Sequence, residues 1–163
     1  MSKNILVLPA DYAAWLISLK RRIASARQRA VLIANEEQIR LYHYIGRDIL
    51  LRQNRQGWGA KVIDRLSADL RAAFPDMKGL STSNLKYMRF FAQECPGSTI
   101  GQQPADQLPW FHIVTLLTKV SEPGIREWYA REVIQQAWSR DTLTILISLG
   151  LAMKHKNVIS KTP

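Results

Sequence analysis

Cysteine and histidine are scarce in this sequence of 163 residues. It contains one cysteine, Cys95, and three histidines, His43, His112 and His155, which lie far apart along the chain. A single cysteine excludes an internal disulfide, and no histidine has a second ligand at metal-binding spacing. We therefore expect no metal and no cofactor. The near absence of cysteine also favours a reducing compartment, so we predict a cytoplasmic protein.

Catalytic sequence patterns are also missing. There is no His-Glu-x-x-His, no phosphate-binding glycine loop and no Gly-x-Ser-x-Gly. Pro75 and Asp76, followed by Lys78, faintly resemble the signature of metal-dependent nucleases, but that site needs adjacent strands to bring its carboxylates together. Here the three residues lie in a predicted turn between helices. We predict no catalytic residues, no small-molecule substrate and no enzyme activity from this chain.

Long apolar runs and strand patterns are absent as well. The longest apolar stretch, residues 143–153, is too short to span a bilayer and is interrupted by polar residues, and residues 1–9 are too short for a signal peptide. No membrane partner is expected. No segment shows sustained alternation of apolar and polar residues, whereas helical spacing recurs throughout. The sequence predicts an all-α fold of about six or seven helices with no β-sheet.

Acidic residues are few in one part of the chain. The formal net charge is +10, and residues 20–89 hold 15 lysines and arginines against 6 acids, a balance of +9. Residues 90–153 hold 4 against 6, a balance of −2. A cluster of cations of this kind suits a polyanion, and DNA is the partner that we expect. The alternative is a solvated basic surface with no partner.

The charge division suggests how the chain is organised. Residues 96–110 hold three prolines and two glycines and are predicted to form an irregular loop. We predict one helical domain over residues 1–153, in which this loop could separate a basic lobe, 10–95, from a near-neutral lobe, 108–153. Residues 154–163 are predicted to form a basic tail or linker.

Residues 79–93 carry the strongest candidate site. Gly79 ends a turn, Ser81 and Ser83 are candidate N-caps, and Leu85 and Met88 begin an apolar stripe. A capped helix after a glycine turn is typical of a helix-turn-helix, so we predict such an element around residues 60–93, although the preceding turn is long. An ordinary surface helix is the alternative. The predicted nucleic-acid-binding residues are Lys61, Arg65, Lys78, Ser83, Lys86, Tyr87 and Arg89.

A near-heptad stripe near the start of the chain supports a different function. Apolar residues recur at alternating spacings of three and four from Leu16 to Ile33, which predicts a helix that packs lengthwise against another helix. The apolar helix at 143–149 also needs a partner surface. The alternative function is therefore an assembly domain that forms a homodimer or docks a nuclease or another protein.

Several short motifs, in order, resemble the N-terminal helical domain of the YhcG family of bacterial proteins. The likeness covers roughly residues 12–151. Its main motifs are 42–46 (YHYIG), 57–59 (GWG), 66–70 (LSADL), 79–81 (GLS), 88–91 (MRFF), 107–110 (QLPW), 126–130 (REWYA) and 138–140 (WSR). In that family this domain usually precedes a nuclease domain of the PDDEXK type. The resemblance implies a helical, non-catalytic accessory module that associates with DNA or with a nuclease, and the nuclease core itself is not expected in this chain.

Overall fold

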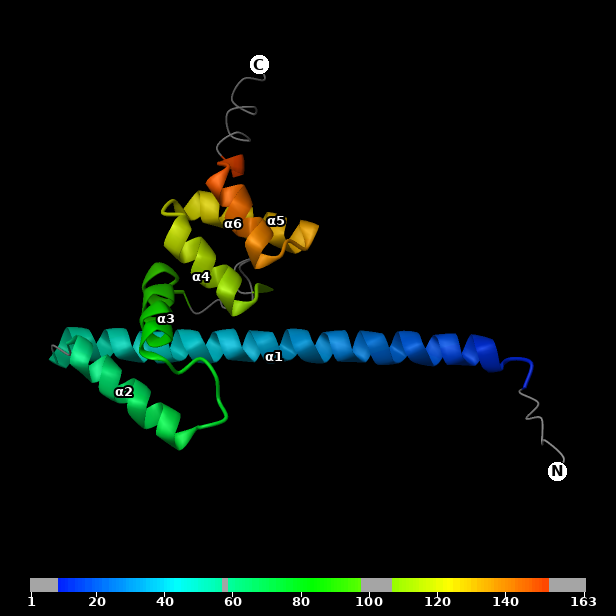
Figure 1. Cartoon of the computed structure of the whole chain (residues 1–163), viewed down its shortest axis with the longest axis horizontal. Coiled ribbons are helices and arrows are strands. Elements are labelled where there is room, and N and C mark those ends of the chain that lie inside the picture. The colour runs from blue at the N-terminus through cyan, green and yellow to red at the C-terminus, as the bar shows by residue number, and fades with distance from the viewer. Residues whose placement is uncertain (1–8, 57–58, 98–106, 153–163) are drawn as a thin grey trace, which may run out of the picture. The chain divides into compact units, whose positions relative to one another are not determined.

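The computed structural model describes residues 9–56, 59–97 and 107–152 of the chain. The described part contains six α-helices and no strand, which confirms the all-α prediction (Figure 1). The helices are α1 (Tyr12–Gln56), α2 (Ala60–Ala73), α3 (Thr82–Glu94), α4 (Trp110–Lys119), α5 (Pro123–Gln136) and α6 (Arg140–Ser148). None of the helices in these ranges is long and apolar enough to cross a membrane.

The chain divides into two compact units, residues 1–34 and 35–163. The boundary falls within α1, so this single helix contributes to both units. Asn35, which could have broken the helix, continues it and donates a hydrogen bond from Nδ2 to the carbonyl oxygen of Leu108, at 3.1 Å. The domain and lobe boundaries expected from the sequence stay predictions. Trp58, His155 and the basic tail lie outside the described residues.

The first unit contains residues 12–34 of α1. Every residue from Lys20 to Ala34 is exposed, and within the described chain this segment has no fully buried side chain. Six large apolar side chains are more than half exposed: Trp15, Ile17, Ile23, Val31, Leu32 and Ile33. Helices without tertiary packing are marginal in water, even when they contain good helix formers such as alanine, leucine and arginine.

The second unit has a continuous apolar core. The remainder of α1 contributes Ile39, Tyr42 and Ile49, and the buried stripe of α3 includes the predicted Leu85 and Met88. Further core residues come from the other helices: Ile63, Phe91, Trp110, Ile113, Leu116, Tyr129, Val133 and Leu143. Burial of apolar surface is the main stabilising term in a core of this kind. The predicted need of residues 143–149 for a partner is met in part, because Leu143 is fully buried while Ile145 and Leu149 stay exposed.

Two glycines allow close approaches within this core. Gly46 lies where α1 meets α3, and a Cβ atom there would be 2.0 Å from the carbonyl oxygen of Met88. Only a residue without a side chain lets the two backbones come so near. Gly79 has a φ of +91° and sits against the hydroxyl of Tyr42. The left-handed φ favours glycine, and the turn it forms leads the chain into α3.

The start of α3 is fixed by a polar network. Of the two candidate caps, Ser81 is the N-cap, and its hydroxyl accepts a hydrogen bond from the amide of Asn84 at 3.3 Å. The buried Asn84 side chain donates to the Gly79 carbonyl at 2.6 Å and accepts from Nε1 of Trp110 at 2.7 Å. One asparagine therefore joins the turn, α3 and α4, and satisfies the indole nitrogen that burial would otherwise leave without a partner.

Aromatic rings surround this network. The ring of Trp110 meets those of Tyr42 and Phe91 edge-on, with centroids 4.9 Å and 5.7 Å away. Edge-to-face pairs of this kind add to the stabilisation from burial. His43 packs on Phe91, and its Nε2 lies 2.7 Å from the carbonyl oxygen of Cys95. His43 is therefore a packing residue with a hydrogen-bond partner.

Candidate functional site

The predicted helix-turn-helix-like element consists of α2 and α3, which pack against each other. The connection between them covers residues 74–81, longer than the three or four residues of a standard helix-turn-helix. Its backbone is held by the hydroxyl of Ser67, which donates to the Leu80 carbonyl at 2.7 Å. The run from Pro75 to Lys78 lies in this connection. The described residues contain no strand, so the nuclease-like pattern has no sheet to support it.

Three of the predicted residues share one exposed face of α3. Ser83, Lys86 and Tyr87 follow helical spacing, and all three are exposed, with Tyr87 at 37%. We call these residues the α3 face. A cation, a hydroxyl and an aromatic ring suit contacts with phosphates and bases. The half-buried Phe90 lies at the next position of the same face.

Arg89 has a different environment from its neighbours on α3. Its side chain is half-buried, and Nη1 donates a hydrogen bond to Oε1 of Gln53 on α1 at 3.1 Å. Nε is buried and has no hydrogen-bond partner among the described residues. The guanidinium therefore contributes to the contact between α1 and α3, and in this arrangement it is not presented on the α3 face.

The remaining three predicted residues lie on α2 and in the connection. Lys61 and Lys78 are exposed. Arg65 is exposed too, but its Nε donates to both carboxylate oxygens of Asp69, at 3.0 Å and 2.9 Å. This hydrogen-bonded carboxylate raises the pKa of the Arg65 guanidinium. A phosphate would have to compete with Asp69 for that arginine, which makes Lys61 and Lys78 the better placed phosphate contacts.

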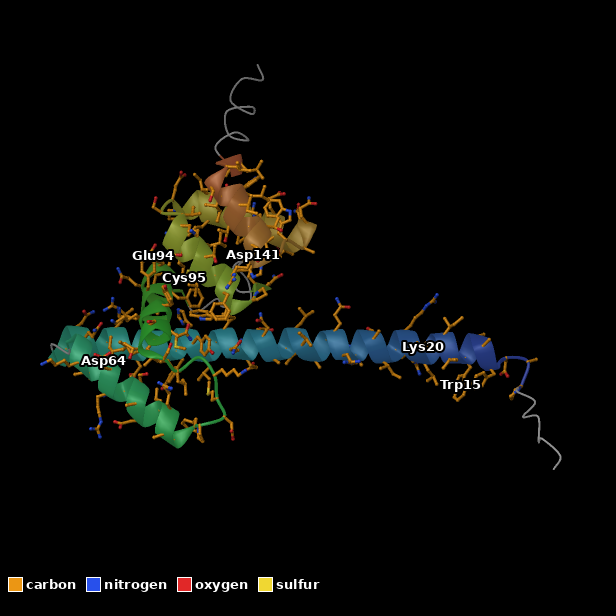
Figure 2. All side chains as sticks on the ribbon, viewed as in Figure 1. Trp15, Lys20, Asp64, Glu94, Cys95 and Asp141 are labelled. Carbon is orange, nitrogen blue, oxygen red and sulfur yellow. The ribbon has the colours of Figure 1, made fainter. Side chains whose placement is uncertain are left out.

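A second candidate surface lies on residues 12–34 of α1, which we call the docking segment. Its heptad stripe comprises Leu16, Leu19, Ile23, Ala26, Ala30 and Ile33, and these residues fall within an arc of about 100° on a helical wheel. Leu16 and Leu19 are half-buried and the other four are exposed. Figure 2 shows two side chains of this segment, Trp15 and Lys20.

The charges of the docking segment differ from those of the rest of the chain. It carries five cations, Lys20, Arg21, Arg22, Arg27 and Arg29, and no acid. None of them forms an ion pair with another described residue, and Arg29 donates to the Ser25 hydroxyl at 2.7 Å. By contrast, arginines elsewhere, such as Arg40 and Arg131, pair with a glutamate four residues away.

The sequence identified this stripe, but not the position of the cations around it. When Leu16 is assigned to position a of a heptad, Lys20 and Arg27 occupy e positions, and Arg22 and Arg29 occupy g positions. These positions border the seam on both sides. The register of the apolar stripe distinguishes the cations that border it from one on the solvated face, Arg21, which occupies an f position.

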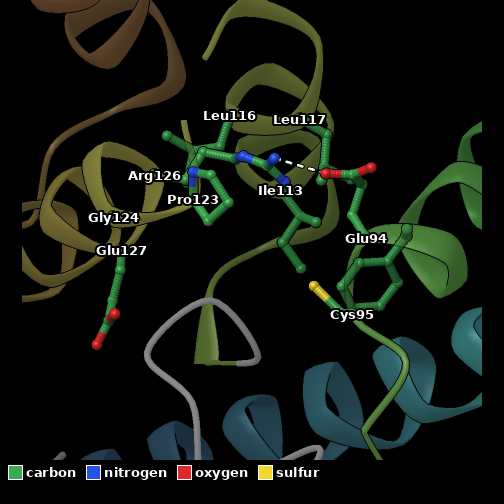
Figure 3. Close-up of a pocket in the computed structure, with 10 residues that line it drawn as sticks. Glu94, Cys95, Ile113, Leu116, Leu117, Pro123, Gly124, Arg126 and Glu127 are labelled. Atoms are coloured by element: carbon green, nitrogen blue, oxygen red, sulfur yellow. Dashed lines mark hydrogen bonds and ion pairs between the residues drawn. The ribbon is translucent and has the colours of Figure 1, made fainter. Parts of the chain in front are cut away.

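A cavity of about 350 Å³ lies among α3, α4 and α5 (Figure 3). Its walls are mainly apolar, with Phe91 and Ile113 among them. At one side, Nη2 of Arg126 contacts Oε2 of Glu94 at 2.6 Å and also donates to the Ser121 carbonyl at 3.0 Å. This ion pair joins α3 to α5, so its charges are used within the fold. None of the seven predicted residues lines the cavity.

No cluster of metal ligands accompanies these surfaces. Across residues 9–56, 59–97 and 107–152, no group of three or more histidine, cysteine, aspartate or glutamate side chains could hold a metal ion. His112 instead contacts the Trp138 carbonyl through Nε2 at 3.0 Å. The described part of the chain thus offers surfaces and one apolar cavity.

The family model for the DUF1016 N-terminal domain matches residues 18–153. The chain belongs to this family. The match confirms the resemblance to the YhcG family, because the DUF1016 N-terminal domain is the N-terminal domain of that family. It covers all of α2 to α6 and most of α1. No curated protein and no solved structure matches the chain.

Proposed function

We propose that this DUF1016 N-terminal domain is an assembly module, in which the docking segment binds a helix of another protein chain. The observation that carries the proposal is the exposed apolar stripe on residues 12–34. Monomeric soluble proteins seldom leave so many large apolar side chains exposed along one element. A helix laid along the stripe would bury Ile23 and Ile33 and stabilise the segment, which has no buried side chain of its own.

Small residues in the middle of the stripe suit this role. Ala26 and Ala30 lie between Ile23 and Ile33, so a second helix can approach closely at the centre while isoleucines fill the space on either side. The docking segment is about 35 Å long at the rise of an α-helix. That length offers about three heptads, enough for a specific but reversible contact.

Photo-crosslinking in the native host tests this proposal. A photoreactive amino acid at Ala26, on the stripe, is compared with one at Gln28, on the opposite side of the helix. Both positions are exposed, so neither substitution disturbs the core. We expect position 26 to give a discrete crosslink whose peptide, identified by mass spectrometry, lies in a heptad-patterned helix. Equal labelling from both positions, or none from either, would contradict the proposal.

Nucleic-acid binding is the second candidate function, supported by the exposed α3 face and the net charge of +10. In this proposal Lys86 and Tyr87 contact the duplex, while Lys61 and Lys78 contact phosphates, as does Arg65 if it releases Asp69. The observations that favour it are weaker than those for assembly, because Arg89, one of the predicted DNA contacts, donates a hydrogen bond to Gln53 within the fold. It is compatible with assembly, since DNA-binding proteins often work as dimers or complexes.

Salt-dependent binding of a fluorescent duplex tests this second candidate. Affinity should fall steeply with salt, and Lys86→Ala should reduce the slope of log K against log salt by about 1, because one phosphate contact is lost. Lys119→Ala, an exposed lysine on α4, is the control and should leave the slope nearly unchanged. Binding that is absent at low salt, or insensitive to salt, would exclude this role for the α3 face.

A further inference from the structure

We propose that the docking segment selects an acidic helix from a different protein, in preference to a second copy of itself. This inference rests on the proposed assembly function and adds the chemistry of the partner. Its basis is the coincidence of two observations on residues 12–34: an exposed heptad stripe, and cations at every charged position that borders it.

Position in the heptad decides which charges meet. In a parallel pair of helices, a g residue faces the e residue of the next heptad on the partner. Two copies of this segment would therefore bring Arg22 against Arg27 of the second copy. In an antiparallel pair, g faces g and e faces e, so Arg22 would face Arg29 and Lys20 would face Arg27. Both arrangements place like charges together along the seam, and both weigh against the homodimer expected from the sequence.

A partner with glutamate or aspartate at its own e and g positions reverses the sign of these contacts. The four bordering cations, Lys20, Arg22, Arg27 and Arg29, then each gain an opposite charge. They are available for this, because none forms an ion pair within the described chain. Charged residues at the edge of a helical interface set partner choice and orientation more than total affinity. The segment is thus built to reject itself and to accept an acidic, heptad-patterned helix.

An anionic membrane surface is the competing occupant, because basic amphipathic helices also lie on such surfaces. The stripe argues for a helix instead. Membrane-surface helices segregate a broad apolar face from a charged face, whereas here Ile17, Val31 and Leu32 lie off the stripe, interspersed with the cations, and the stripe has Ala26 and Ala30 at its centre. Small residues at the centre of a narrow stripe favour close packing of two helices.

Designed peptides test the inference on the full chain. Two labelled three-heptad peptides share leucine and isoleucine at a and d but carry either glutamate or lysine at every e and g position. We expect the glutamate peptide to bind at least about tenfold more tightly than the lysine peptide, with a difference that shrinks as salt is raised. A third peptide keeps the glutamates but has glutamine at a and d. It should not bind, because the contact between the two helices requires apolar side chains at these positions.

Variants of the chain provide the matched control. Arg22→Glu with Arg29→Glu reverses two bordering charges and should weaken binding of the glutamate peptide at least about tenfold. Arg21→Glu with Arg71→Glu changes the net charge equally, but neither residue borders the stripe, and both are exposed. This second pair should weaken binding less than about threefold. Equal losses in the two variants would show attraction to overall charge and would overturn the inference.

Other outcomes separate the partner chemistry from the assembly role. Equal binding of the two charged peptides, or a dimer in sedimentation that Ile23→Gln abolishes, would overturn the acidic partner while leaving assembly intact. Vesicles containing phosphatidylglycerol that bind the chain through residues 12–34, with no binding of the glutamate peptide, would assign the segment to a membrane instead. Loss of the Ala26 crosslink together with failure of every peptide would contradict both the inference and the proposed function.

Discussion

The two halves of α1 belong to one continuous helix but have very different surroundings. Residues 35–56 bury Ile39, Tyr42 and Ile49 in a core, whereas every residue from Lys20 to Ala34 is exposed. The second half is therefore stabilised by packing, and the first half depends on intrinsic propensity and on its continuity with the second half. The difference teaches that one helix can combine a half packed into a core with a half whose apolar residues stay exposed.

The largest expected effect comes from Gly46. Gly46→Ala should destabilise the second unit by about 3 kcal/mol, although alanine has the higher helix propensity, because the new Cβ would overlap the Met88 carbonyl and force α1 and α3 apart. Urea denaturation followed by circular dichroism measures the change. Gly124→Ala is the control: its Cβ would meet the nearest atom at 3.6 Å, and stability should change by less than about 0.5 kcal/mol. An unchanged stability of Gly46→Ala would mean that the second unit tolerates a wider separation of α1 and α3.

Asn84 should give the next largest effect. Asn84→Ala leaves Nε1 of Trp110 and the Gly79 carbonyl without partners, and we expect a loss of about 2–3 kcal/mol. The neighbouring Ser83→Ala, on the exposed α3 face, should cost less than about 0.5 kcal/mol. Thermal denaturation of the two variants measures both. Similar melting temperatures would show that the hydrogen bonds of Asn84 contribute little to the stability of the second unit.

Tyr42 should make the stability of the second unit sensitive to alkaline pH. Burial raises the pKa of its hydroxyl, while the hydrogen bond from Gln38 acts in the opposite direction. Above about pH 10, the usual tyrosine value, the unfolded chain loses this proton before the folded chain does. The free energy of unfolding should therefore fall as pH rises through that range. Below it, both states keep the proton and the contribution does not vary.

Tyr42→Phe separates this effect from ordinary packing. At pH 8 the variant should lose about 1 kcal/mol, because the hydroxyl bonds to Gln38 and to the Lys78 carbonyl disappear. Between about pH 9 and 11 its stability should then decline less steeply than that of the parent, as measured by urea denaturation. Parallel declines in the two proteins would assign the alkaline sensitivity to other groups.

The smallest effect on stability is expected in the exposed half. Ile23→Gln should change the free energy of unfolding by less than about 0.5 kcal/mol, because the side chain is already 57% exposed. Ile39→Gln places the same amide in a fully buried position and should cost about 2–3 kcal/mol. A large loss of stability from Ile23→Gln would remove the distinction between the two halves.

Sequence reasoning identified the fold well because helical spacing and capping residues are local signals. The all-α class, the buried stripe with Leu85 and Met88, and the family were all predicted from the chain. Gly46 is also a local signal, because the cost of a glycine in the middle of a helix needs a compensating contact. Helical spacing and capping depend on neighbours within a few residues, and a glycine in the middle of a helix has few structural explanations.

Contacts between distant residues could not be predicted in the same way. Arg89 pairs with Gln53, which lies 36 residues earlier, and no local pattern links them. The indole of Trp110 bonds to Asn84 across 26 residues, so the asparagine could not be identified as a structural anchor. Asn35 in α1 makes a contact of the same kind, because its side chain bonds to the Leu108 carbonyl 73 residues later.

The positions of two tryptophans provide the chain with its own optical reporters. Trp15 is 57% exposed within the docking segment, while Trp110 is 5% exposed in the core and hydrogen-bonded to Asn84. Indole emission shifts to shorter wavelength when water is removed from the ring. Occupation of the stripe should therefore shift the emission of Trp15, and only unfolding should shift that of Trp110. Since the sequence holds five tryptophans, the difference in emission between the parent and a Trp15→Phe variant would isolate the signal of Trp15 and report binding without a label.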